Sequence, residues 1–259
     1  MIGVTITPAE ITSLDELRQI LKPVSDLTSS LQSRTAHFGV VGPLYFETIS
    51  LMKSLRNLSP TSNLICKNLI DNLSLRFVPI LSLDINKFSS FLDPRIKGAS
   101  GLSSSMAVEL AEKLFGEVID HTLLATSSTS QQQQSSDFSA FLAINTPVES
   151  FDSPLATEIA TYMALPPVPL LSSPADKRTI TELWADCEQT YVFYRKHKTA
   201  LPILFELARA AFATPISASE IERGFSVSSK MGAPGRNFKP KSLKRMVLLN
   251  NNYRFSKMI

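Results

Sequence analysis

The sequence predicts a mainly α fold with few or no strands, and three observations support this prediction. Glycine is scarce relative to proline, with 9 and 16 residues, and only 8% of residues are aromatic, which is unusual for a β-sandwich. Apolar residues recur every three or four positions along several segments, the period of an amphipathic helix. No segment alternates strongly between apolar and polar residues, although residues 140–146 could form a short strand.

Two amphipathic helices are predicted in the first 60 residues. The first begins at Ser13, because Ser13 and Glu16 have the spacing of a capping box. Pro23 should end or bend this helix. The second helix follows the leucines of residues 44–58, and Pro60 closes that segment.

A third helix, a turn and a long helix are predicted next. The third helix runs over residues 66–80, with Cys66 as a small core residue and Pro79 as an interruption. Residues 91–100 should form an ordered turn, because Pro94 fixes its own backbone and disfavours helix at the residue before it. A long helix is then expected over residues 106–119.

The second half of the chain begins with a segment of low complexity. Residues 126–136 are serine, threonine and glutamine, which bury too little apolar surface to offset the entropy of ordering. A short helix opened by Ser153 follows, and then an extended proline-rich stretch. Helices are predicted again over residues 181–197, as one continuous element, and over residues 201–212.

The cysteines and the hydropathy indicate a reducing, aqueous environment. Cys66 and Cys187 lie far apart and neither belongs to a C-x-x-C pair, so no disulfide framework or zinc finger is expected. No basic segment followed by an apolar one opens the chain, and no apolar run approaches the ~18 residues of a membrane span. We therefore expect a soluble intracellular protein with no membrane partner.

Positive charge is concentrated at the C-terminal end. The formal net charge is only +3, yet from Arg223 onward there are nine basic residues and no acidic one. Such asymmetry points to an anionic partner, usually nucleic acid. The alternative is that this tail packs on an acidic surface of its own chain or of a second copy. For the first case the candidate DNA contacts are Arg223, Arg236, Lys239, Lys241, Lys244 and Arg245.

An ordered series of short motifs runs through the last third of the chain. It comprises Trp184, Leu201-Pro202-Ile203-Leu204 with Leu207-Ala208, Pro215, Glu222-Arg223-Gly224-Phe225-Ser226, Arg236-Asn237 and Leu248-Leu249-Asn250. This series resembles the C-terminal dimerisation region of hAT-superfamily transposases and the host proteins derived from them. The upstream segment LDPRIK, residues 92–97, is also similar to the family. The chain departs from it in having one tryptophan instead of two, and Val227 where a glycine is usual.

The resemblance implies a multi-helix fragment of an RNase H-like transposase. Residues 1–125 would correspond to the helical insertion, residues 126–175 to a linking region with a short helix, and residues 176–259 to the dimerisation region. The apolar surfaces of this last region are large for a short segment to bury alone, so we expect two copies to bury them together. The predicted dimer interface consists of Trp184, Tyr191, Tyr194, Leu204, Leu207, Phe212 and Phe225.

The resemblance also implies that Glu222 is the third carboxylate of a two-metal site. Such a site needs several converging carboxylates around two divalent cations. Asp152, Asp176 and Asp186 lack the central-strand setting of the family's aspartates, so Glu222 is expected to be a vestigial position or an ordinary ion-paired glutamate. No cofactor is expected, and Mg²⁺ enters only if another chain or a longer product supplies the missing aspartates.

Other chemistries find no support in the sequence. There is no G-x-S-x-G, P-loop, H-E-x-x-H or dinucleotide fingerprint. His37, His121 and His197 are dispersed, and neither cysteine has a histidine next to it. Distance along the sequence does not exclude a contact in space between a cysteine and a histidine.

The sequence therefore predicts a protein dimerisation module derived from a transposase, with no catalytic site of its own and with weak, non-specific DNA binding. The expected partner is a second copy or a related transposase-derived protein, and the expected location is the nucleus, with the cytoplasm as the alternative. The alternative function is a component of a transposase or nuclease to which Glu222 contributes.

Overall fold

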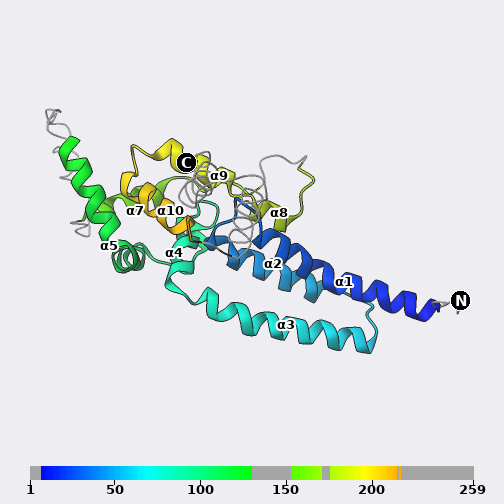
Figure 1. The fold of residues 1–259 in the computed structure, drawn as a ribbon. Helices are drawn as coiled ribbons and strands as arrows, with labels where there is room; N and C mark the ends of the chain where they lie inside the picture. The colour runs from blue at the N-terminus through cyan, green and yellow to red at the C-terminus, as the bar shows by residue number, and fades with distance from the viewer. Residues whose placement is uncertain (1–6, 130–152, 171–175, 215, 217–259) are drawn as a thin grey trace, which may run out of the picture.

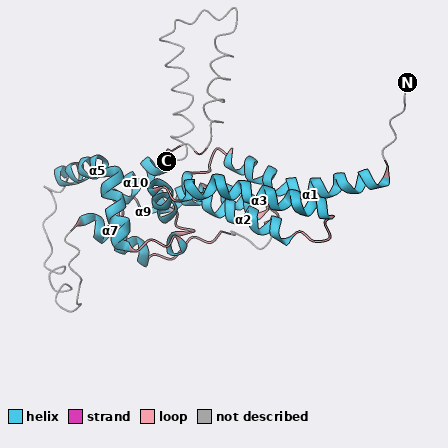
Figure 2. Cartoon of the chain, turned by 90° about the horizontal axis from the view of Figure 1, so that it is seen from below, coloured by secondary structure: helices cyan, strands magenta, loops and turns pink. Residues whose placement is uncertain are grey.

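A computed structural model describes residues 7–129, 153–170, 176–214 and 216, and every secondary structure element within them is a helix (Figures 1 and 2). This confirms the mainly α prediction. The predicted strand at residues 140–146 lies outside the described residues. The elements are α1 (Pro8–Leu31), η1 (Phe38–Val40), α2 (Val41–Ser54), α3 (Pro60–Leu81), α4 (Asp84–Leu92), η2 (Lys97–Ala99), α5 (Ser104–Thr129), α7 (Pro154–Ala164), α8 (Ile180–Ala185), α9 (Glu188–His197) and α10 (Pro202–Phe212).

The helices form two regions, which we call the arm and the body. The arm is α1, α2 and α3, which extend side by side toward the N-terminal end (Figure 1). One small apolar cluster, centred on Ile20, Met52 and Cys66, joins its three helices. Cys66 is buried there, as predicted.

The first helix of the arm begins earlier and ends later than predicted. Thr7 caps it, and Glu10 completes the capping box. The predicted start at Ser13 is wrong, because Glu16 instead accepts hydrogen bonds from the backbone and hydroxyl of Ser59 at the start of α3. The helix also continues through Pro23 to Leu31. Pro23 is buried, and packing on that face offsets the hydrogen bond that the proline cannot donate.

The third helix likewise passes through its proline. It runs to Leu81, and Pro79 lies inside it. Of its 22 residues only Ser62 and Cys66 are buried, so α3 covers the arm on one side and leaves most of its own surface open. In the view of Figure 2 it lies over the other two arm helices.

The body contains α4, α5, α7, α9 and α10 around the largest apolar core. The long helix α5 is broken by a kink at Phe115, whose backbone φ and ψ are −138° and 27°. The fully buried large side chains of this core are Phe88, Phe91, Leu92, Leu155, Ile159, Tyr162, Leu201, Leu204 and Leu207. They come from all three regions that the sequence predicts, so these regions share one core in the folded chain.

The predicted helix over residues 181–197 is two helices. Its first part, α8, packs on α1 and α2 of the arm, and its second part, α9, belongs to the body. The break falls at Asp186 and Cys187, where Asp186 has an extended backbone. The short helix at Ser153 and Pro154 and the helix over residues 201–212 are both present as predicted.

Within the described part of the chain, no helix combines the length and the apolar character needed to cross a membrane.

Candidate functional site

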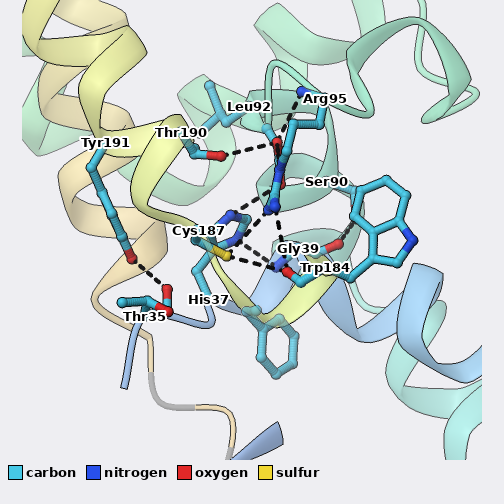
Figure 3. A network of polar contacts seen from close by, with 12 residues as sticks. Thr35, His37, Gly39, Ser90, Leu92, Arg95, Trp184, Cys187, Thr190 and Tyr191 are labelled. Atoms are coloured by element: carbon cyan, nitrogen blue, oxygen red, sulfur yellow. Dashed lines mark hydrogen bonds and ion pairs between the residues drawn. The ribbon is translucent and has the colours of Figure 1, made fainter. Parts of the chain in front are cut away.

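A buried polar centre lies where the arm, α8 and the body meet (Figure 3). It consists of His37, Asp93, Arg95, Cys187 and Thr190. His37 precedes η1, Asp93 and Arg95 follow α4, and Cys187 and Thr190 open α9. The side chains of His37, Asp93 and Arg95 are 0%, 0% and 2% exposed. A cluster of charges this deep requires internal partners, because desolvation of an unpaired charge costs several kcal/mol, on the order of the whole stability of a domain.

Asp93 is the anion of the centre, and its position follows from the local sequence. Pro94 ends α4, so Asp93 has an extended backbone and turns its side chain inward. Its carboxylate accepts hydrogen bonds from the backbone and side chain of Arg95, with Nη2 at 2.7 Å, and from the Thr190 hydroxyl at 3.2 Å. Burial raises the pKa of Asp93, but His37 and Arg95 outweigh it and hold the pKa well below its usual range. Asp93 therefore stays ionised.

Arg95 links this anion to the end of α8. Its Nη1 donates to the carbonyl oxygens of Leu183 and Asp186, at 3.2 and 2.9 Å, and its Nη2 lies 3.2 Å from the sulfur of Cys187. The last carbonyl groups of a helix have no partners within the helix, so the guanidinium satisfies groups that burial would otherwise leave unpaired. Burial lowers the pKa of Arg95, but the opposing effects of its partners, chiefly Asp93, are larger in sum, so the net shift of the pKa is upward. The guanidinium is thus permanently charged.

His37 closes the centre on the arm side. Its Nδ1 accepts a hydrogen bond from the Gly39 amide at 3.2 Å, and its ring stacks on Phe212 with centroids 4.0 Å apart. Nε2 lies 3.2 Å from Asp93 but out of line for a hydrogen bond, so this contact is mainly electrostatic. Burial lowers the pKa of His37, while Cys187 and Asp93 raise it, to about 9 overall. The Gly39 contact opposes this rise, because a protonated Nδ1 could not accept that hydrogen bond.

The residues Cys187, His37 and Asp93 are of the types that make a nucleophile, a base and an orienting acid. The sequence left such a spatial contact open, and the fold does bring the three together. All three are fully buried, however, with Cys187 at 0% exposure. No substrate can reach the sulfur in this arrangement, so the geometry serves structure: it joins the start of η1, the end of α4 and the start of α9.

A surface groove of about 390 Å³ lies nearby, between α1 and α8. It does not reach the buried centre. Six hydroxyl side chains contribute to its lining, and two of them already bond the backbone of α8, since Ser30 donates to Thr181 and Thr35 to Ala185. The groove is therefore the seam along which α8 attaches to the arm. Its lining residues are Lys22, Asp26, Ser29, Ser30, Ser33, Thr35, Thr179, Thr181, Glu182, Ala185 and Asp186.

Two further buried charges cap helix ends within the body. Lys97 donates to the carbonyl oxygens of Tyr162 and Leu165 at the end of α7, and burial lowers its pKa. Glu158 accepts from the amides of Ile203 and Leu204, at 3.1 and 2.9 Å, at the start of α10. Asp93, Arg95 and Lys97 of the LDPRIK segment thus all contact other helices or their ends.

The predicted dimer-interface residues that the structure describes lie mostly inside the chain. Tyr194, Leu204, Leu207 and Phe212 belong to the body core and are 0–7% exposed. The hydroxyl of Tyr194 donates to the Leu92 carbonyl at 2.7 Å. The hydroxyl of Tyr191 donates to the Thr35 carbonyl at 3.1 Å (Figure 3). The half-buried Trp184 ring lies 5.4 Å from the Arg95 guanidinium. Contact of these side chains with a second copy would need the helices to exchange between chains, and it stays a prediction.

The remaining candidate residues lie outside the described residues. These are Glu222, Phe225 and the predicted DNA contacts Arg223, Arg236, Lys239, Lys241, Lys244 and Arg245. Among the described residues, no group of three or more histidine, cysteine or acidic side chains is arranged to hold a metal ion. Asp186, weighed as a possible metal ligand, pairs with Arg178 at 2.5 Å.

The sequence interpretation missed the buried centre itself. One signal for it was present: three charged residues alternate with Pro94 and Ile96 directly after the apolar Phe91 and Leu92. Charged residues that are buried need paired partners, so charges set among apolar residues indicate a segment in which internal ion pairing is worth testing. His37 and Cys187, 150 residues apart, carried no comparable signal.

No model of a known protein family matches the chain, and a search of curated proteins finds no relative.

Proposed function

We propose that this chain is a protein-interaction module without a catalytic site of its own, whose helical arm associates with a second copy. The observation that carries the proposal is the unequal use of apolar side chains. The arm leaves eight large apolar side chains between 39% and 76% exposed, namely Ile11, Leu14, Leu21, Phe46, Leu51, Leu64, Leu75 and Val78, whereas the larger body leaves three at 49% to 66%, namely Met106, Leu124 and Val192. Every helix of the arm therefore exposes apolar side chains, and concentrations of exposed apolar surface mark interaction sites in soluble proteins.

The charged and polar groups support the same function. The Cys187, His37 and Asp93 set is sealed inside the molecule, and the charges of the LDPRIK segment bond helix ends and one another. These residues give the arm a fixed attachment to the body. A rigid attachment favours a surface that recognises a partner, because less conformational entropy is lost on binding.

The origin from an hAT-type transposase remains part of the proposal and rests on the sequence motifs alone. It would make the natural partner a second copy or a related transposase-derived protein, in the nucleus. The described residues do not include Glu222, and no observation on them favours the nuclease alternative. Magnesium-dependent cleavage of DNA by the purified chain would overturn the non-catalytic proposal.

The test of association is the molar mass in solution. Light scattering coupled to size-exclusion chromatography at about 5 to 200 μM should give a mass that rises from one chain toward two chains, since small apolar interfaces are weak. A mass of one chain across the whole range would contradict the proposal.

The proposed weak DNA binding depends on the basic tail and has its own test. Replacing Lys239, Lys241, Lys244 and Arg245 by glutamine should weaken binding to duplex DNA and flatten its salt dependence, which is about −0.9 per neutralised phosphate. The matched control replaces four exposed basic residues of the arm, Arg18, Lys53, Arg56 and Arg76, and should bind almost as the parent does. Equal binding by parent and tail variant at every salt concentration would remove DNA from the proposal.

A further inference from the structure

The outer face of α3 carries a regular stripe that no described part of the chain covers. Thr61, Leu64, Asn68, Asp71, Leu75 and Val78 are all exposed, and they are spaced alternately by three and four residues. Leu64, Leu75 and Val78 are 58%, 76% and 52% exposed. The spacing is that of the a and d positions of a coiled coil.

The opposite face of the same helix packs on the arm. Cys66, Leu69, Leu73 and Phe77 contribute to the apolar clusters that hold α3 to α1 and α2. If the stripe residues are the a and d positions of a heptad, Cys66 and Leu73 occupy f positions, which lie on the side of the helix opposite the stripe. The stripe therefore lies on the face of α3 opposite the one that packs on α1 and α2, and Figure 1 shows α3 along one side of the arm.

We propose that this stripe pairs with the same stripe of a second copy in an antiparallel, two-fold symmetric helix pair. This inference rests on the proposed function and assigns the surface that performs it. In antiparallel coiled coils an a position faces a d position of the partner. The stripe offers one register in which every such layer is chemically matched.

In that register Leu64 faces Leu75 of the second copy, and Thr61 faces Val78 of the second copy. The central layers pair Asn68 with Asp71 of the second copy, so that an amide donor meets a carboxylate acceptor. Two-fold symmetry repeats each pair in reverse, which gives six layers in all. The exposed Lys67, next to Asn68, lies on the side where it can approach the same Asp71 and offset its charge.

The other exposed stripe of the arm lacks this self-complementarity. On α1 the corresponding positions are Ile11, Leu14, Arg18 and Leu21, all exposed. Two antiparallel copies of α1 would set Arg18 against Leu14 of the second copy, a layer that pairs a charged side chain with an apolar one, which the α3 register avoids. This is why the pairing is assigned to α3, and it makes α1 a matched control.

The predicted pair is small. From Thr61 to Val78 the helix rises about 26 Å, at 1.5 Å per residue. One helix pair of this length buries less than the roughly 1,200 Å² of a stable interface, so association in the micromolar range is expected.

The first test compares the double variant Leu64→Lys and Leu75→Lys with the control Leu14→Lys and Leu21→Lys. All four side chains are at least 50% exposed, so neither variant should perturb the fold, and circular dichroism with thermal melting checks this. At about 200 μM the parent and the control should sediment with the same dimer fraction, and the α3 variant should lose at least tenfold in association constant.

The second test fixes the register. Leu64→Cys and Leu75→Cys are prepared separately, and both native cysteines are buried and shielded from reagent. A short bismaleimide should cross-link an equimolar mixture of the two variants much faster than either variant alone.

The outcomes separate the two proposals. A parent that stays monomeric overturns both the proposed association and this inference. A parent dimer that the α3 substitutions leave intact overturns the inference and leaves self-association in place. Cross-linking of Leu64→Cys to itself, faster than to Leu75→Cys, would mean a parallel pair and would overturn the antiparallel register.

Discussion

The arm and the body use similar helices in opposite ways. In the body, α10 buries seven of its 11 residues, among them Leu204 and Leu207 at 0% exposure. In the arm, α3 buries two of its 22 residues and exposes three large apolar side chains on one face. Both helices begin with proline at their first turn. The amphipathic pattern of a helix therefore does not by itself reveal which of its faces the same chain covers.

The largest expected effect comes from breaking the centre that joins the two regions. Asp93→Asn keeps the size of the side chain but leaves the Arg95 guanidinium buried without its anion. Removing one partner of a buried ion pair costs about 3 to 5 kcal/mol in the free energy of unfolding. Urea denaturation measures this loss. The control Asp84→Asn, in an exposed pair with Lys113, should change stability little.

The next effect contrasts the cores directly. Leu204→Ala in the body should reduce the free energy of unfolding by about 2 to 5 kcal/mol, because it leaves a cavity in a fully buried site. Leu75→Ala in the arm, at 76% exposure, should stay within about 0.5 kcal/mol in a dilute, monomeric sample. Equal losses of stability for the two variants would mean that Leu75 is buried in the folded protein, contrary to its exposure in the structure.

A smaller loss is expected where η1, which directly precedes α2, contacts α4. Gly39 lies so close to the backbone of Ser89 that an added Cβ would overlap its carbonyl group. Gly39→Ala should therefore cost about 1 to 3 kcal/mol through displacement of the chain. Gly98→Ala, at a position where no atom lies within 4 Å of the added Cβ, is the control. Thermal melting of both variants checks this prediction, and matched melting temperatures would refute it.

The smallest effect near neutral pH concerns the ionisation of Asp93. Its folded pKa lies below its unfolded value of about 3.9, so its contribution to stability is complete above that value and is lost as the pH falls through the folded pKa. The ¹³C chemical shift of the Asp93 carboxyl should stay constant from pH 7 down to about pH 4. A midpoint near 3.9 would show that the centre does not hold its charge.

The sequence was sufficient for helices whose ends are set by neighbouring residues. Pro154 and Pro202 mark the first turns of α7 and α10 as expected. The sequence was insufficient where contacts with distant residues determine the end of a helix. The break between α8 and α9 depends on Arg95, which binds the carbonyls of Leu183 and Asp186 and so satisfies the end of α8.

The same reasoning explains the missed start of α1 and the missed centre. Two capping-box patterns follow each other there, and only the contact of Glu16 with Ser59 of α3 shows that the second is used elsewhere. The centre needs His37, Asp93 and Cys187 from three segments, and no local rule places them together. The charged residues of the LDPRIK segment indicated that the segment was unusual. Their partners lie on other helices, however, so only the fold identifies them.

Amide hydrogen exchange at two protein concentrations, about 2 and 200 μM, can locate the proposed interface. We expect slower exchange at the higher concentration in residues 64–78 of α3 and no change in α10, because a single chain already buries the body core. Protection that increases in α10 and not in α3 would instead place the interface on the C-terminal helices and would rule out pairing through α3.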